Sequence, residues 1–162
     1  MKDILVLGIG NEYLSDDGIG PKITMDLKNS ELNQYADFDT CYISGLDLLQ
    51  LIEGYKTLLV IDATVHPDSN PGEVCIFKNV DEAKSLHLDN FHDISFKNCL
   101  KLGIEAGLNI PEDVCVISIG IIEDKLFSKE LSKPLKLKYK EIFSEIQSFI
   151  NQKIIKFDSI AV

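Results

Sequence analysis

Three aspartates and one histidine are the residues whose types and positions indicate chemistry. Asp16 and Asp17 follow a glycine turn, Asp62 follows five apolar residues, and His92 precedes a helix-like segment. Oxygen and nitrogen ligands of this kind suit a divalent transition metal with open coordination positions. A bound cation also removes the repulsion between neighbouring carboxylates. The residue types therefore indicate a site for a divalent metal.

Each of these residues also has an ordinary structural role available. Asp16 or Asp17 alone is often the N-cap of a helix, and His92 alone is more often a surface histidine. Asp62 is more informative, because an ionised carboxylate placed directly after a fully apolar run must find a partner. The metal interpretation depends on these residues coming together in space.

The elements that would position them alternate between strand-like and helix-like segments. Strand-like runs occupy residues 4–7, 38–43, 57–61, 73–77 and 114–120. Helical periodicity follows Asp17 and Asp47, spans residues 93–102 until Gly103 breaks it, and resumes beyond Pro134. This alternation predicts an α/β fold, a three-layer α/β/α sandwich around a mainly parallel, twisted sheet of about five strands.

The predicted sheet brings Asp16, Asp17, Asp62 and His92 towards one edge. Ligands of open parallel sheets bind beyond the carboxyl ends of the strands, near the point where the strand order reverses. The first strand leads into the turn that carries Asp16 and Asp17, and the third strand ends at Asp62. His92 lies in a connection expected to cross the same edge. We therefore expect one site containing Asp62, His92 and a carboxylate from Asp16 or Asp17.

Composition restricts the partners and the setting of this 162-residue chain, for which we expect a single domain over residues 1–162. A formal charge of −10 argues against a nucleic-acid partner, because phosphate binding needs clustered Lys and Arg. The longest apolar runs are strand-sized, so no membrane span is expected. A strand begins almost at the N-terminus, without the regions of a secretory signal, which favours the cytoplasm.

The glycine turn at residues 8–10 has rival interpretations. Gly8-Ile9-Gly10 opens a dinucleotide-binding fingerprint, but Tyr13 stands where the third glycine would fall. No Gly-Lys-Ser/Thr follows, so the P-loop signature is absent. Gly-Ile-Gly-Asn after a strand is also similar to peptidyl-tRNA hydrolases. Those enzymes carry a histidine shortly after this turn, where this chain has Asp16 and Asp17. A nucleotide-binding module is therefore the least favoured alternative, and the turn is interpreted as a scaffold for a carboxylate.

Taken together, the motifs resemble those of the hydrogenase maturation endopeptidases, which trim the large subunit of nickel–iron hydrogenases. The first motif is LVLGIGN at residues 5–11, followed after a short stretch by DDGIG at residues 16–20. The second is LVIDA at residues 59–63, and the third is the histidine at a helix start, His92. A final strand and turn, ISIGI at residues 117–121, also fits. The resemblance extends from residue 4 to about residue 122.

The resemblance implies an endopeptidase that recognises nickel in the precursor large subunit and removes its C-terminal extension. It implies that Asp17, Asp62 and His92 contact the metal and form the catalytic site, because the family uses the second acid of the first motif, which is Asp17 rather than Asp16. The nickel would be carried by the substrate rather than bound permanently, and the precursor would be the protein partner.

Two further functions stay open for the same ligand set. One is a non-catalytic nickel-binding chaperone of maturation, which would bind metal without cleaving a peptide. The other is a related protease of the same fold that acts on another precursor, such as the spore germination protease type. Cleavage of a nickel-loaded precursor distinguishes the three functions.

Overall fold

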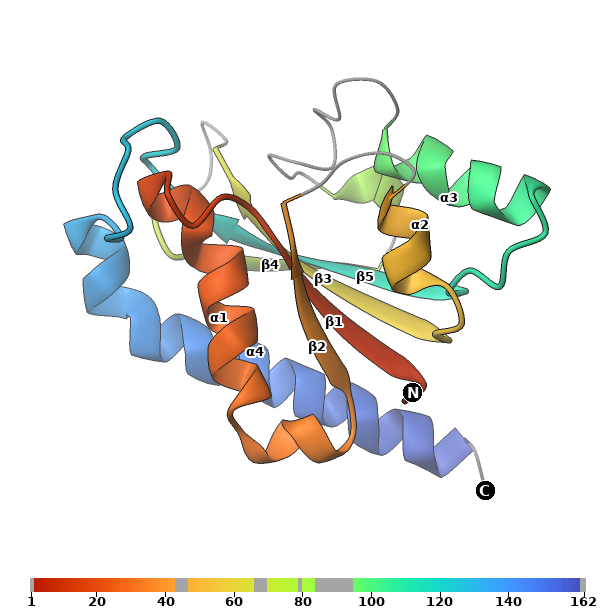
Figure 1. Ribbon diagram of the computed structural model, residues 1–162. Helices are drawn as coiled ribbons and strands as arrows, with labels where there is room; N and C mark the ends of the chain where they lie inside the picture. Colours follow the sequence, from red (N-terminus) through yellow and green to blue (C-terminus); the bar gives the residue numbers. More distant parts are fainter. Residues whose placement is uncertain (1, 43–46, 66–69, 79, 84–94, 161–162) are drawn as a thin grey trace.

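The computed structural model describes residues 2–42, 47–65, 70–78, 80–83 and 95–160 (Figure 1). The strands are β1 (Ile4–Ile9), β2 (Asp37–Cys41), β3 (Thr57–Thr64), β4 (Val74–Phe77) and β5 (Asp113–Gly120). The α-helices are α1 (Ile19–Lys28), α2 (Asp47–Ile52), α3 (Phe96–Glu105) and α4 (Lys133–Ile160). Short 3-10 turns are η1 (Ser15–Gly18), η2 (Glu31–Gln34) and η3 (Val80–Glu82).

The strands form one sheet in the order β2-β1-β3-β5-β4. β2, β1, β3 and β5 run parallel, while β4 pairs antiparallel with β5 at the edge. Helices cover both faces of this sheet (Figure 1). The predicted α/β sandwich with a mainly parallel sheet is confirmed.

Two apolar clusters fill the space between the layers. Leu59, Ile61 and Ala63 of β3 pack in the cluster that includes residues of α1 and α4. Leu58 and Val60, which alternate with them, pack in the cluster that includes residues of α2 and α3. β3 is buried along its whole length, as expected for a central parallel strand covered on both faces.

β3 extends further than its apolar run predicts. The sequence predicts a strand that ends at Asp62, but β3 continues through Asp62 to Thr64. Its pairing with β5 continues to the same point, where Thr64 lies opposite Gly120. Asp62 is therefore a residue within a central strand rather than the first residue of a loop.

Gly103 does not break the third helical segment, so that prediction is wrong. α3 continues through it to Glu105. A Cβ on Gly103 would lie 2.8 Å from a side-chain carbon of Leu49 and 2.9 Å from one of Ile110. The glycine is thus explained by close packing, which outweighs its low helix propensity. Gly107, with a φ of 78°, lies just beyond the helix.

The helix predicted beyond Pro134 is confirmed as α4. Its apolar stripe, with Leu135, Ile142, Ile146 and Ile150, packs against the sheet. Pro134 is the second residue of the helix, where its missing N–H costs no hydrogen bond. Within the described residues, no helix is both long enough and apolar enough to cross a membrane.

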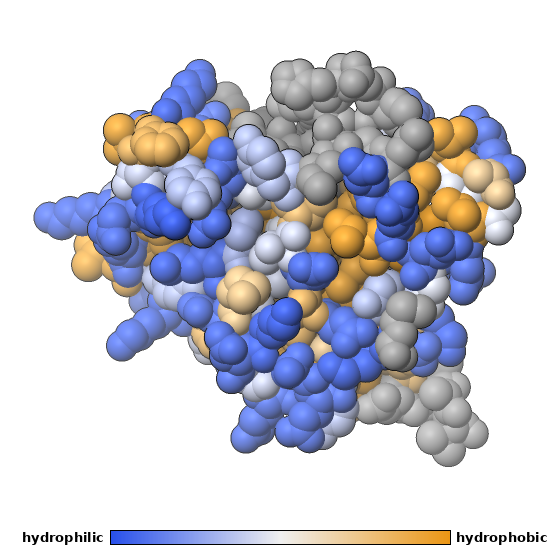
Figure 2. All heavy atoms as spheres, in the orientation of Figure 1, coloured by the Kyte–Doolittle hydropathy of each residue, from blue (hydrophilic) through white to orange (hydrophobic). Residues whose placement is uncertain are grey.

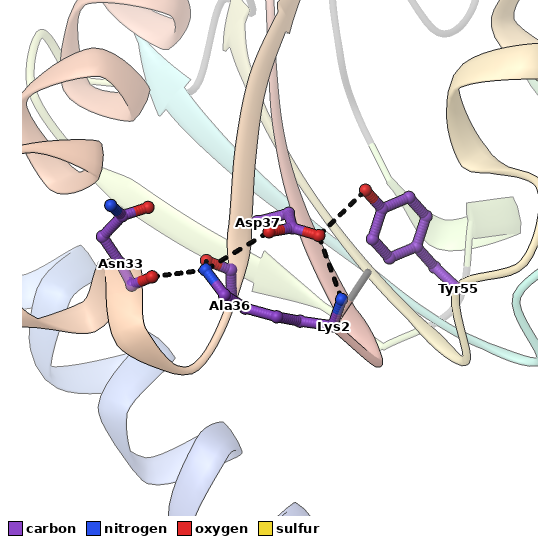
Figure 3. A network of polar contacts seen from close by, with 5 residues as sticks. All are labelled: Lys2, Asn33, Ala36, Asp37 and Tyr55. Atoms are coloured by element: carbon purple, nitrogen blue, oxygen red, sulfur yellow. Dashed lines mark hydrogen bonds and ion pairs between the residues drawn. The ribbon is translucent and has the colours of Figure 1, made fainter.

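A polar network joins the amino-terminal ends of β1 and β2 (Figure 3). The Lys2 ammonium donates to the carbonyls of Asn33 and Ala36, and it lies 3.2 Å from an Asp37 carboxylate oxygen. The Lys2 backbone N–H and the Tyr55 hydroxyl donate to the other oxygen of Asp37. Partial burial raises the pKa of Asp37, but these hydrogen bonds outweigh it, so the pKa is lowered.

Candidate functional site

The strand order of the sheet reverses between β1 and β3, and this position is called the switch point of the sheet. β2 lies on one side of β1, and the chain then crosses to place β3 on the other side. β1 leads into η1, which carries Asp17, and β3 carries Asp62. η1 also contacts β3. The structure thus brings Asp17 and Asp62 to one edge of the sheet, where ligands bind in open α/β folds.

Two glycines let the chain fold back tightly over this edge. Gly10 has a φ of 141°, and a Cβ there would lie 2.1 Å from the Asp17 carbonyl oxygen. A Cβ on Gly20 would lie 2.6 Å from the carbonyl oxygen of Ile61 and 2.7 Å from that of Ile9. The start of α1 therefore rests directly on the ends of β1 and β3. Only glycine permits this approach, which explains the spacing of the first motif.

Asp17 is directed back towards the end of β1. The residue is only 3% exposed, and its Oδ2 accepts a hydrogen bond of 2.8 Å from the Asn11 backbone N–H. A backbone donor of this kind stabilises the ionised carboxylate and fixes its orientation. The carboxylate is therefore held in one orientation at the carboxyl end of the sheet.

Asp62 is fully buried in the centre of the sheet. Its Oδ1 accepts a hydrogen bond of 2.8 Å from the Ala63 backbone N–H, and Ser118 of β5 lies opposite it. Side chains alternate along a strand, so Asp62 lies on the same face as Val60, the face covered by α2 and α3. Because burial of a carboxylate is costly, its presence in a central strand is typical of a functional position.

Asp16 has a different role from its neighbour. It is fully buried, and its two oxygens accept hydrogen bonds from the backbone N–H groups of Ser132, at 2.6 Å, and Glu123, at 3.3 Å. Its own backbone N–H donates to the Glu123 carbonyl at 3.1 Å. Asp16 thus anchors the segment between β5 and α4. Both of its oxygens accept bonds from backbone N–H groups of that segment.

Asn11 and Tyr42 also belong to this edge, although the sequence-based reasoning assigned them no role. The Asn11 side chain donates to the Tyr42 hydroxyl at 3.2 Å and accepts from the Tyr13 backbone N–H at 3.0 Å. The backbone N–H of Asn11 therefore orients the Asp17 carboxylate, and the Asn11 side chain stabilises the turn. The signal available in the sequence was an asparagine directly after a glycine, a residue type that commonly bonds its own turn.

The third predicted member of the site, His92, lies outside the described residues. Among the residues that the structure does describe, no three Asp, Glu, His or Cys side chains gather as a metal site. The two buried carboxylates supply hard oxygen donors, and an additional ligand from elsewhere would be needed to complete a transition-metal set. The donor chemistry of Asp17 and Asp62 fits a divalent cation.

Comparison of the sequence with protein families gives one match that decides the assignment. Residues 43–149, more than half of the chain, match the family model described as hydrogenase maturation protease. The chain belongs to the hydrogenase maturation protease family. Its members are endopeptidases, and hence hydrolases, that act in protein processing. Among curated protein sequences, none matches the chain significantly.

Solved structures of hydrogenase maturation proteases have the same fold. The hydrogenase maturating endopeptidase HybD from Escherichia coli superposes with a TM-score of 0.71 at 20% identity, over 94% of each chain. The [NiFe] hydrogenase maturation protease HybD from Thermococcus kodakarensis gives 0.65 at 24% identity, over 92% of this chain and 99% of that one. HycI from the same archaeon gives 0.66 at 21% identity, over 96% and 93%.

Proposed function

We propose that this chain, residues 1–162 forming one domain, removes the C-terminal extension from the precursor large subunit of a nickel–iron hydrogenase. Membership of the hydrogenase maturation protease family supports the reaction class. The observation that carries the proposal is the pair of buried carboxylates, Asp17 and Asp62, at the switch point of the sheet. Ligands of open α/β sheets bind beyond this edge, which is where a substrate polypeptide would approach the two carboxylates.

In this proposal, Asp17, Asp62 and His92 contact nickel that the precursor brings with it. Two buried carboxylates are costly without a cation, and a divalent ion offsets both their burial and their mutual repulsion. Because the metal arrives with the substrate, binding would report that the precursor has been loaded. Premature cleavage of an empty precursor is thereby avoided.

The proposed chemistry is hydrolysis by an activated water molecule. One of the two carboxylates accepts a proton from a water molecule while the oxygen of that water attacks the scissile carbonyl carbon. The carbon–nitrogen bond then breaks, and the proton passes to the leaving amine. The site's own contribution is to hold the carboxylate in one orientation, as the Asn11 N–H does for Asp17.

Substitution of the three ligands tests the proposed site. Asp17→Asn, Asp62→Asn and His92→Ala should each slow cleavage of a nickel-loaded precursor by about a hundredfold or more, since even outer-shell changes cost 10–100-fold. Asp39→Asn, an exposed aspartate of β2, is the matched control and should cleave normally. Cleavage that survives all three substitutions would show that the site is wrong. Nickel binding without any cleavage by the unmodified protein would favour the chaperone.

A further inference from the structure

An exposed aromatic cluster lies beside the candidate site. Phe127 is 80% exposed and Tyr13 is 43% exposed, and Leu126 is also exposed. Figure 2 shows apolar spheres gathered at the end of the molecule where the segment between β5 and α4 lies against η1. Large exposed apolar side chains that cluster in this way are typical of protein-binding surfaces.

The cluster has a fixed internal arrangement. The rings of Tyr13 and Phe127 are stacked, with centroids 6.2 Å apart and planes inclined by 15°. The Lys129 ammonium lies 4.4 Å from the centroid of the Tyr13 ring, a cation–π contact. We call Tyr13, Leu126, Phe127 and Lys129 the aromatic platform. Because the side chains of Tyr13, Phe127 and Lys129 already contact one another, they present one continuous surface to a partner.

The platform is connected directly to the candidate site. The Ser128 N–H donates to the Tyr13 carbonyl at 2.9 Å, and the Ser15 N–H donates to the Ser128 carbonyl at 2.7 Å. Asp16 then holds both ends of the same segment through Glu123 and Ser132. These contacts join the platform to the residue that precedes Asp17. A protein seated on the platform is therefore held at a defined position relative to the carboxylates.

We propose that the aromatic platform is the docking surface for the folded body of the precursor large subunit. This inference rests on the proposed function and adds a recognition surface to it. A folded protein whose C-terminal segment reaches Asp17 and Asp62 lies over the adjoining rim, which is where the platform is. Aromatic side chains, phenylalanine included, are enriched at protein–protein interfaces. Exposed Lys125 and Lys129 flank Leu126 and Phe127, and exposed Glu12 precedes Tyr13, so the surface fits a partner with an apolar centre surrounded by charged residues of both signs.

Binding and cleavage of the nickel-loaded precursor by platform variants test the proposal. Phe127→Ala should raise both Kd and KM by at least about tenfold and leave kcat within about twofold, because it removes binding rather than chemistry. Phe127→Tyr keeps the ring and should restore binding. Tyr35→Ala removes another exposed aromatic side chain (53%), near the start of β2 at the opposite end of the sheet, and should behave as the unmodified protein.

The outcomes separate the platform from the proposed function. If the unmodified protein cleaves the precursor, and Phe127→Ala matches Tyr35→Ala in Kd and KM, the platform proposal is wrong and the protease proposal stands. If it binds the precursor without cleaving it, and Phe127→Ala abolishes binding, docking stands and proteolysis fails. Absence of binding overturns both. Self-association that Phe127→Ala abolishes, with precursor binding unchanged, assigns the surface to a second copy and overturns docking.

Discussion

The carboxylate of Asp16 accepts a 2.6 Å hydrogen bond from the backbone N–H of Ser132, 116 residues further along the chain. Asp17, the next residue, accepts its bond from Asn11, only six residues away. One turn of 3-10 helix thus directs two adjacent acids to different partners. Asp16 joins two distant segments of the chain, while Asp17 lies at the edge where the candidate site is.

Asp16→Asn should destabilise the protein by about 1–3 kcal/mol, because it removes a buried charge-assisted acceptor and turns an amide donor towards a backbone N–H. Urea unfolding measures the change. Hydrogen exchange of the Glu123 and Ser132 amides should accelerate more than exchange in β3. Equal stability of Asp16→Asn and the exposed control Asp39→Asn would contradict the anchoring role.

Gly20→Ala should disrupt the packing of α1 on the strands that carry the candidate site. The added methyl would meet two backbone carbonyls of β1 and β3, which move only if α1 shifts from the sheet. We expect a loss of about 1–3 kcal/mol in stability together with reduced cleavage. Gly103→Ala is the matched comparison, because its close neighbours are side-chain atoms of Leu49 and Ile110 that can move more easily. A larger stability loss for Gly103→Ala than for Gly20→Ala would contradict this account.

Asp37 should make the stability depend on acidic pH. Its pKa is lowered in the folded protein, chiefly because the hydrogen bonds from Lys2 and Tyr55 outweigh the effect of burial. A lowered folded pKa contributes stability that is complete above the unfolded value, about 4, and is lost as the pH falls through the folded pKa. The contribution should be about 1 kcal/mol or less, since the pair is partly exposed.

Urea unfolding of the protein and of Asp37→Asn between neutral and acidic pH measures this contribution. The difference in free energy of unfolding between the two proteins should shrink as the pH falls below 4. A difference that stays constant with pH would show that the Asp37 carboxylate is not stabilised in its charged form. Cleavage at neutral pH should be unaffected, because Asp37 lies at the amino-terminal end of the sheet.

The arrangement of Asp17 and Asp62 was accessible to sequence reasoning because it depends on local pattern. Apolar runs define the central strands, and parallel strands bring their carboxyl ends to one edge. The glycines around the first turn then fix where η1 packs. The extent of β3 beyond Asp62 was not accessible, since it depends on pairing with β5, which is distant in sequence.

The roles of Asp16 and the aromatic platform depend on contacts that no local pattern encodes. Asp16 bonds to residues more than 100 positions away, so its type alone did not distinguish an anchor from a ligand. The prediction that Gly103 ends a helix was wrong for the same reason. The side chains that require a glycine there come from α2 and from the loop before β5. Tertiary contact outweighs local propensity at both positions.

The central claim is that the carboxylates at the switch point cut a nickel-loaded precursor. The most direct measurement is the intact mass of the precursor large subunit after incubation with the protein, with nickel present and absent, and with Asp17→Asn in parallel. The account predicts loss of one C-terminal peptide only from the nickel-loaded precursor and only with the unmodified protein. An unchanged precursor mass with folded, unmodified protein, or equal cleavage by Asp17→Asn, would contradict it.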